Sequence, residues 1–224
     1  MKQIIYCLQN KVIESILVKA NILTNESIII RSPRELLELD LKKIKPSFIM
    51  FPHWSYIVPT KITNNYDCVC FHSTPLPYGR GGSPLQNMIL AGHSETELCS
   101  LKMTGKLDEG PVYLRSKVSL KGKMSEILDR VYNEIANQIR ILLSEEVKPK
   151  PQKGKITYFK RLKKSDNFLD LSREITDIYD SIRMVDSDLY PDAQIILGNK
   201  KIIFYDAEIS ENSLIAKVKI NDKD

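Results

Sequence analysis

Residues 71–84, which read Phe-His-Ser-Thr-Pro-Leu-Pro-Tyr-Gly-Arg-Gly-Gly-Ser-Pro, form the stretch around which this chain is organised. The run that leads into it, residues 67–71, is short and apolar and predicts a buried strand. Residues 85–90 have helical spacing, and the Ser-Pro pair before them supplies an N-cap and a first-turn proline. His72 therefore stands where a strand ends and a loop begins, which is the edge at which open α/β sheets bind ligands. Prolines fix the course of this loop, while its glycines allow close approach to the backbone.

Strand and helix patterns alternate along the first half of the chain. Residues 2–8, 27–31 and 47–51 predict strands, and residues 11–20 and 33–41 predict helices. This alternation implies right-handed crossovers and a parallel sheet. The turn after the first strand has no glycine, so the phosphate-binding loop of NAD or FAD enzymes is missing. We expect an α/β fold with a Rossmann-like, mostly parallel sheet and flanking helices.

The second half of the chain adds strands, one long helix and a candidate boundary. Residues 124–147 predict an amphipathic helix, and residues 148–155 form a linker rich in proline and lysine. The predicted strands are 96–102, 111–120, 156–161, 193–197, 201–208 and 213–220, and a helix over 171–185 is expected to be capped by Ser172. We therefore expect a Rossmann-like domain, residues 1–147, the linker 148–155, and a small C-terminal α+β extension, residues 156–224, with a helix and a β-hairpin.

The composition is that of an ordinary globular protein, with 42% hydrophobic residues, 27% charged residues and a net charge of +5. A weakly basic surface suits anionic ligands without indicating nucleic acid, and the basic run 160–164 is more often a solvated surface. The four cysteines lack metal-ligand spacing, so reduced thiols and no metal are expected. No apolar stretch has the length of a signal or membrane segment, which predicts a cytoplasmic protein without membrane contact.

Two segments resemble the 10-formyltetrahydrofolate-dependent formyltransferases. The family pattern is Asn-x-His-x-Ser-Leu-Leu-Pro-x-x-Arg-Gly, followed later by Asp-x-Gly. The matching residues here are His72, Ser73, Leu76, Pro77, Arg80, Gly81, Asp108 and Gly110. The variant Leu-Pro-Tyr-Gly-Arg-Gly-Gly-Ser-Pro-Leu-Gln-Asn is most similar to the small nucleotide-amino-sugar N-formyltransferases of pseudaminic-acid-type pathways. The resemblance implies that a formyl group is transferred from 10-formyltetrahydrofolate, without a metal, to the amine of a nucleotide-linked 4-amino-4,6-dideoxy sugar. It also implies that the nucleotide is UDP and that the reaction belongs to surface polysaccharide biosynthesis.

The family pattern assigns catalytic roles to His72 and Asp108. The imidazole would donate to the developing oxyanion or carry a proton, and the carboxylate would orient the imidazole or a water and take the amine proton. Cys70 stands at the position of the family's Asn, and a thiol is a weaker donor than an amide. Losing one such donor typically costs about a hundredfold in rate. Asn87, Gln86 or a backbone N–H could supply the donor instead.

The resemblance also implies the binding residues. Trp54 and Tyr56, in the loop after strand 47–51, offer aromatic walls for a pterin ring, although such residues also simply cover sheet edges. The expected cofactor-binding residues are Trp54, Tyr56, Ile57, Arg80, Gly81 and Gly110. The expected substrate-binding residues are Ser73, Thr74, Pro75, Tyr78, Gly79 and Tyr190. Arg80 would pair with the folate glutamate or a substrate phosphate. Without the family pattern, His72 reads as an ordinary hydrogen-bonded histidine and Asp108–Gly110 as a plain turn.

Other functions remain open from the sequence. Methionyl-tRNA formylation is the first alternative, but about 70 residues follow the linker, which favours a small acceptor and no nucleic-acid partner. Glycinamide ribonucleotide formylation is disfavoured by the same extension. A non-catalytic folate-binding module is supported mainly by Cys70. The last strands could form the surface of a homodimer.

Overall fold

The computed structural model describes residues 3–223. Its segments assemble into two compact units that interleave along the sequence. The first unit contains the chain up to Arg80 together with 97–118 and 131–158, and the second contains 81–96, 119–130 and the chain from Phe159 onward. The predicted linker, residues 148–155, lies within the first unit. Three predicted positions lie outside the described residues: the two domain boundaries at residues 1 and 224, and Lys2 of the predicted first strand.

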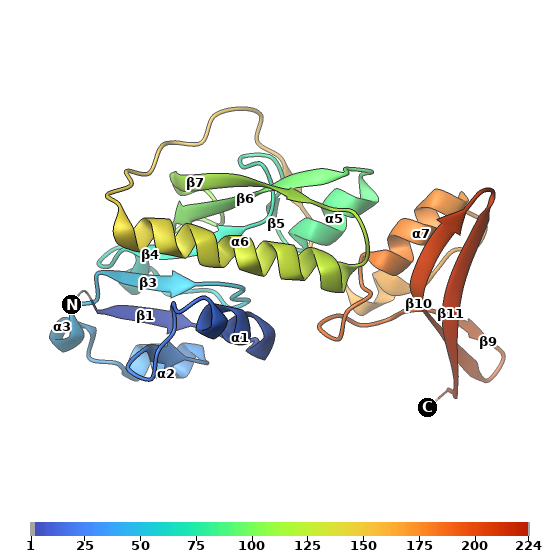
Figure 1. Cartoon of the computed structure of the whole chain (residues 1–224), viewed down its shortest axis with the longest axis horizontal. Coiled ribbons are helices and arrows are strands. Elements are labelled where there is room, and N and C mark those ends of the chain that lie inside the picture. Colours follow the sequence, from blue (N-terminus) through green and yellow to red (C-terminus); the bar gives the residue numbers. More distant parts are fainter. Residues whose placement is uncertain (1–2, 224) are drawn as a thin grey trace. The chain divides into compact units, whose positions relative to one another are not determined.

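A six-stranded sheet with the order β2-β1-β3-β4-β6-β7 forms the centre of the first unit (Figure 1). Its strands are β1 (Ile4–Cys7), β2 (Ile28–Ile30), β3 (Phe48–Phe51), β4 (Cys68–His72), β6 (Glu95–Lys102) and β7 (Val112–Ser119). The first four strands pair in parallel, and β6 runs antiparallel to β4. The expected α/β fold with a mostly parallel sheet and flanking helices is therefore confirmed.

The helices of this region are α1 (Lys11–Lys19), α2 (Pro33–Glu38), α3 (Leu41–Ile44), α4 (Thr60–Thr63) and α6 (Met124–Ser144). The long helix α6 lies across the sheet (Figure 1). Its buried Gln138 donates to Leu98 O of β6 at 3.0 Å. The prediction of one helix over residues 33–41 was wrong. Leu39 leaves the helical conformation, and the Asp40 side chain accepts from Lys43 N, which starts the new helix α3.

The second unit carries a three-stranded antiparallel sheet, β9 (Ala193–Leu197), β10 (Lys200–Ser210) and β11 (Ser213–Asp222), in the order β11-β10-β9. Helix α7 (Ile175–Arg183) packs on β10. The sequence placed the start of α7 too early: Ser172 bonds to Asp170 instead of capping the helix. The unit also contains α5 (Pro84–Leu90) and the 3₁₀ turn η1 (Lys164–Asn167). Strands β5 (Arg80–Gly81) and β8 (Tyr158–Phe159) pair with each other.

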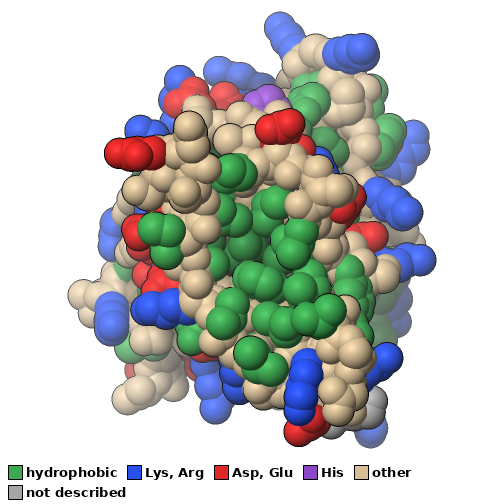
Figure 2. Space-filling view, turned by 90° about the vertical axis from the view of Figure 1, so that its right-hand side faces the viewer, with side chains coloured by type: hydrophobic (Ala, Val, Ile, Leu, Met, Phe, Trp, Pro, Cys, Tyr) green, Lys and Arg blue, Asp and Glu red, His purple; other side chains and the backbone are tan. Residues whose placement is uncertain are grey.

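Hydrophobic side chains gather over the sheet of the second unit (Figure 2). Leu197 is 67% exposed, Val218 49% and Ile220 60%. In contrast, Ile203 on β10 and Ile178 and Ile182 on α7 are buried. Because successive side chains of a strand point to opposite faces, one face of this sheet packs on α7 and the other is exposed.

Candidate active site

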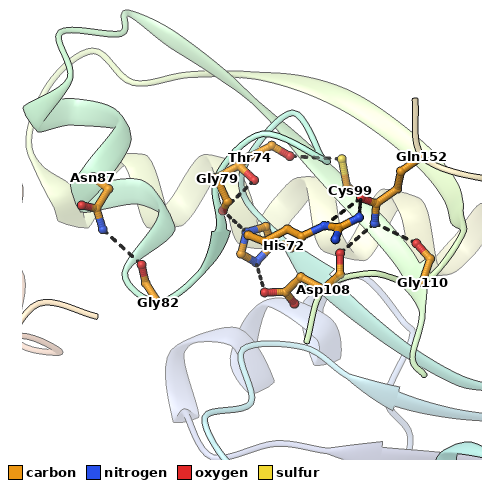
Figure 3. Close-up of polar contacts among 10 residues, drawn as sticks. His72, Thr74, Gly79, Gly82, Asn87, Cys99, Asp108, Gly110 and Gln152 are labelled. Carbon is orange, nitrogen blue, oxygen red and sulfur yellow. Dashed lines mark hydrogen bonds and ion pairs between the residues drawn. The ribbon is translucent and has the colours of Figure 1, made fainter. Parts of the chain in front are cut away.

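His72 and Asp108 meet at the carboxyl end of β4. His72 is the last residue of β4, and Asp108 lies in the loop between β6 and β7. The His72 Nδ1 atom is 3.6 Å from Asp108 Oδ2, and both side chains are almost completely buried (Figure 3). The structure therefore brings together two residues that are 36 positions apart in the sequence, as the proposed chemistry requires.

The loop after β4 fixes which nitrogen of His72 carries a hydrogen. The Nε2 atom lies 2.8 Å from Gly79 O, and Thr74 Oγ1 donates to the same oxygen at 3.3 Å (Figure 3). A carbonyl oxygen can only accept, so we assign the hydrogen to Nε2. Nδ1 therefore faces the carboxylate of Asp108 at 3.6 Å, which is longer than a direct hydrogen bond.

A close backbone contact places the loop that carries Asp108. Asp108 itself has φ +52°, a left-handed conformation that Asp tolerates better than most residues. A Cβ added at Gly110 would lie 1.6 Å from Lys102 O, so any larger residue would displace the turn. The glycine predicted to bind the cofactor is thus required by the packing of its own backbone against β6.

Gln152 braces this loop and was not predicted from the sequence. Its Nε2 donates to Asp108 O at 2.7 Å and to Gly110 O at 2.8 Å, while its Oε1 accepts from Arg80 Nε and Nη2 (Figure 3). It lies in the segment that composition marks as a linker, as the one amide among lysines and prolines. That contrast is the only signal in the sequence that could have pointed to it.

Arg80 is directed at groups of the protein itself. Its side chain is almost completely buried, and Nη1 lies 3.2 Å from Glu109 Oε1 while Nε and Nη2 bond Gln152. The guanidinium therefore ties the loop after β4 to the loop of Asp108. Its expected role as a partner for a folate glutamate or a substrate phosphate stays a prediction.

Cys70 presents a neutral thiol. It lies on β4 between Phe51 of β3 and Leu101 of β6. Burial, and secondarily the charge of Asp108, raises the pKa of this thiol well above its usual value. A neutral thiol is a weak hydrogen-bond donor, so Cys70 does not reproduce the donor that the family's Asn provides.

The amides considered as replacements for that donor belong to the second unit and are engaged there. Asn87 Nδ2 donates to the carbonyls of Gly82, Ser83 and Lys160 (Figure 3 shows the first). Gln86 is buried and bonds Tyr190, whose pKa burial raises. Ser83 was expected to cap α5 with its side chain, which is wrong: its Oγ accepts from Leu162 N instead.

The loop after β3 carries the aromatic residues expected to bind the cofactor. Trp54 packs edge-to-face on Phe51 and on Tyr56, with ring centroids 5.8 Å and 5.4 Å apart. Tyr56 is half exposed and Ile57 is 91% exposed. Trp54 Nε1 is buried and has no hydrogen-bond partner among residues 3–223. The aromatic pair thus covers the sheet edge while leaving one ring and one aliphatic side chain open to a ligand.

The other predicted residues fall into two places. Ser73, Thr74, Pro75, Tyr78 and Gly79 all lie in the loop after β4, where Thr74 O accepts from Cys99 Sγ and Gly79 N donates to Thr157 Oγ1. Gly81 and Tyr190 belong to the second unit. Gly81 has φ +105°, and a Cβ there would lie 2.5 Å from Phe159 O. The close approach that this glycine permits is therefore made by the chain itself.

Comparisons with known proteins match this chain along most of its length. A solved methionyl-tRNA formyltransferase from Clostridium thermocellum is 34% identical, with a TM-score of 0.92 over 99% of this chain and 100% of that chain. A methionyl-tRNA formyltransferase from Sulfurihydrogenibium sp. (strain YO3AOP1) is 30% identical over 84% of this chain. The matched region covers 62% of the length of that relative. The family model for the C-terminal domain of methionyl-tRNA formyltransferase matches residues 164–221. A sugar N-formyltransferase from Shewanella sp FDAARGOS_354 is 16% identical, with a TM-score of 0.68 over 97% of this chain and 96% of that chain, a likeness of fold alone.

These matches overturn one expectation. The predicted acceptor, a nucleotide-linked amino sugar of a pseudaminic-acid-type pathway with no nucleic-acid partner, is wrong, because the stronger similarity is to methionyl-tRNA formyltransferases. Among residues 3–223, no group of three or more metal-ligating side chains could hold a metal ion. In the same part of the chain, no helix combines the length and apolar character that crossing a membrane requires.

Proposed function

Because the chain belongs to the formyltransferase family, we propose that it transfers a formyl group from 10-formyltetrahydrofolate to the amino group of a methionine esterified to tRNA. The folate would supply the formyl group, and the protein would hold the two reactants and move one proton. The buried His72–Asp108 pair is the observation that carries this proposal.

The geometry of the pair suits amine acylation. Such a reaction needs a base near the attacking nitrogen and a donor near the acyl oxygen, where negative charge develops. Asp108, held by Gln152 and Gly110, would take the amine proton, directly or through a water. His72, with its Nε2–H donated to Gly79 O, would accept that proton on Nδ1 and deliver it to N10 of the folate as the bond between N10 and the formyl carbon breaks.

The loop after β3 offers a surface that fits a flat heteroaromatic ring. Tyr56 and Ile57 are open to such a ring, and Trp54 stiffens the loop through its contacts with Phe51 and Tyr56. The buried, unpartnered Trp54 Nε1 could donate to a polar atom of the ligand after a small displacement. We therefore propose that the pterin ring binds against this loop.

The acceptor is proposed from likeness and charge together. The similarity to the Clostridium thermocellum protein extends over the whole length of both chains. Residues 148–164 contain eight Lys and Arg and no Asp or Glu. None of these eight side chains forms an ion pair with a described residue, so their charges are available to phosphates. The basic run that the sequence favoured as a solvated surface then becomes a candidate contact for tRNA.

The direct test is to incubate the protein with 10-formyltetrahydrofolate and methionyl-tRNA, and to measure formylmethionine by mass spectrometry after releasing the amino acid. Uncharged tRNA and free methionine serve as controls. We expect methionyl-tRNA to be formylated and neither uncharged tRNA nor free methionine to be modified. Folate binding without formylation would favour the non-catalytic module and contradict the proposal.

A further inference from the structure

The turns after β1 and β3 flank the point where the order of the sheet reverses. In the order β2-β1-β3-β4, the chain leaves β1 to one side to form β2 and returns to the other side to form β3. Open α/β sheets bind ligands outside the carboxyl ends of their strands at such a switch point. Asn10 follows β1 and His53 follows β3, so the polar residues of interest stand at this position.

The two histidines of the first unit lie at the carboxyl ends of two neighbouring strands, His53 just after β3 and His72 at the end of β4. Phe51 of β3 is the register partner of Cys70 of β4. His53 lies two residues beyond Phe51, and His72 lies two residues beyond Cys70. Both histidines therefore lie at the carboxyl ends of neighbouring strands, the edge of the sheet at which the His72–Asp108 pair lies.

A chain of hydrogen bonds from two other elements holds the His53 ring. Asn10 Oδ1 accepts from Val12 N at 2.7 Å, which assigns its Nδ2 as the donor to Tyr132 Oη at 2.9 Å. The same Tyr132 oxygen is 2.8 Å from His53 Nδ1. We assign the hydroxyl hydrogen to that contact, so Nδ1 accepts and the ring hydrogen resides on Nε2. The three hydrogen-bonded residues, Asn10, Tyr132 and His53, all lie in the first unit.

The backbone around His53 is equally constrained. His53 has φ +54°, a left-handed conformation that is uncommon for residues other than glycine. Ser55 N donates to Gln9 Oε1 at 3.0 Å, so the turn after β1 holds the loop on both sides of Trp54. Burial lowers the pKa of His53, which keeps the ring neutral. No described residue is an acceptor for Nε2, so the structure holds an oriented neutral donor without an internal partner.

We propose that His53 positions the acceptor substrate by donating its Nε2–H to the carbonyl oxygen of the aminoacyl ester. This inference rests on the proposed function. The carbonyl carbon of the ester is bonded directly to the carbon that bears the amine. One hydrogen bond to the carbonyl oxygen would therefore orient the amine nitrogen towards His72 and Asp108. A neutral Nε2–H suits this task, because it can donate to an ester oxygen without adding a charge next to the acceptor amine.

The experiment compares His53→Ala with His53→Gln, whose amide keeps a donor, and with His93→Ala, an exposed histidine of the second unit. The probe is a hydrolysis-resistant acceptor analogue, adenosine carrying methionine through a 3′-amide, and it is titrated calorimetrically without folate so that no formyl transfer can occur. We expect the affinity to fall about tenfold in His53→Ala, as for one lost hydrogen bond, and to stay within about threefold in His53→Gln. In steady-state assays, KM for methionyl-tRNA should rise by the same factor, and KM for the folate should not change.

The outcomes separate this inference from the proposed function. Binding of the analogue that depends on His53, without any formyl transfer by the wild-type protein, would overturn the proposed function and leave this inference standing. Equal affinity in wild type and His53→Ala would overturn the inference, as would no binding by the wild type. A rise in KM for the folate in place of the acceptor would do the same. Thermal melting of each variant verifies that it is folded.

Discussion

At the scale of single residues, the site depends on which atoms hold hydrogens. His72 has a carbonyl on one nitrogen and the carboxylate of Asp108 near the other. The ring is therefore the group through which a proton can pass between Asp108 and a bound reactant. Asn10, Tyr132 and Gln152 act differently, because they orient other groups through fixed hydrogen bonds.

Replacing the imidazole should remove most of the activity. In His72→Asn an amide that cannot exchange a proton at neutral pH stands in its place, so we expect kcat to fall about 100-fold or more, the range typical of acid–base groups. Folate affinity should change little. Single-turnover formylation measures the effect, with His93→Asn as the control. Near-normal turnover by His72→Asn would refute the role assigned to His72.

The brace made by Gln152 can be tested with an isosteric change. Gln152→Glu removes both donated hydrogen bonds, to Asp108 O and Gly110 O, and sets a carboxylate against those carbonyls. We expect a loss of about 1–3 kcal/mol of unfolding free energy, as for unsatisfied buried groups, together with a roughly tenfold lower kcat. Urea unfolding and steady-state kinetics measure the two effects.

Lys61→Gln is the matched control for this brace, because it makes the same change in net charge at an exposed residue of the same unit that lies outside residues 148–164. It should leave stability and kcat unchanged. If both variants behave alike, the effect is one of charge, and Gln152 does not position the loop.

At the scale of elements, a single close contact sets the turn between β6 and β7. Gly110→Ala would bring a methyl group against Lys102 O, which is rigid strand backbone, so the turn and Asp108 must move. We expect more than about 2 kcal/mol of destabilisation and a lower kcat, since the change falls among the strongly disruptive backbone substitutions. Gly105→Ala, in the same loop, meets only Thr60 Cγ2 at 3.4 Å and should be tolerated. Denaturant midpoints of the two variants decide; equal midpoints would contradict the packing argument.

The sheet of the second unit contains an acid-sensitive contact. Asp206 accepts from Lys123 Nζ at 2.8 Å and from Lys217 Nζ at 2.6 Å, and these bonds lower its pKa from 3.8 to about 2. Because the folded pKa is the lower one, this contribution to stability is complete above about pH 4 and is lost as the pH falls to about 2. Asp206→Asn should therefore be less stable than wild type at pH 5 and nearly equal to it at pH 2. A stability difference that does not depend on pH would count against this contact.

At the scale of the whole molecule, charge distribution separates a tRNA acceptor from a small one. Each cation that neutralises a phosphate steepens the decrease of log affinity with log salt by about 0.7–0.9. We expect the slope of log affinity for tRNA against log salt concentration to become shallower by up to about 3 when Lys153, Lys155, Lys160 and Lys164 are changed to Gln. The control changes four other exposed lysines, Lys19, Lys42, Lys43 and Lys61, to Gln and so matches the total charge. Filter binding at several salt concentrations gives the slopes, and equal slopes for both sets would exclude a specific contact by residues 148–164.

The expected elements were found mostly within a few residues of their predicted ends. Apolar periodicity is a local property, and it placed strands such as β3 and β4 and the long helix α6 correctly. The errors lie where side chains compete for helix starts, at Asp40, Ser83 and Ser172, because capping depends on which donor each oxygen finds in three dimensions. The prediction of the acceptor class was wrong for a related reason. It was based on the loops expected to bind the formyl donor, and the residues of those loops do not determine the surface that contacts the acceptor.

The sequence by itself determined the α/β class and, through the family pattern, the two residues that the fold brings together at the end of β4. Only the tertiary structure revealed Gln152 behind Asp108, and the contact of His53 with Tyr132, 79 residues away in the chain. The physical reason is range. Periodicity and turn chemistry act between residues a few positions apart, whereas a buried hydrogen-bond partner is chosen by packing, which sequence spacing does not encode.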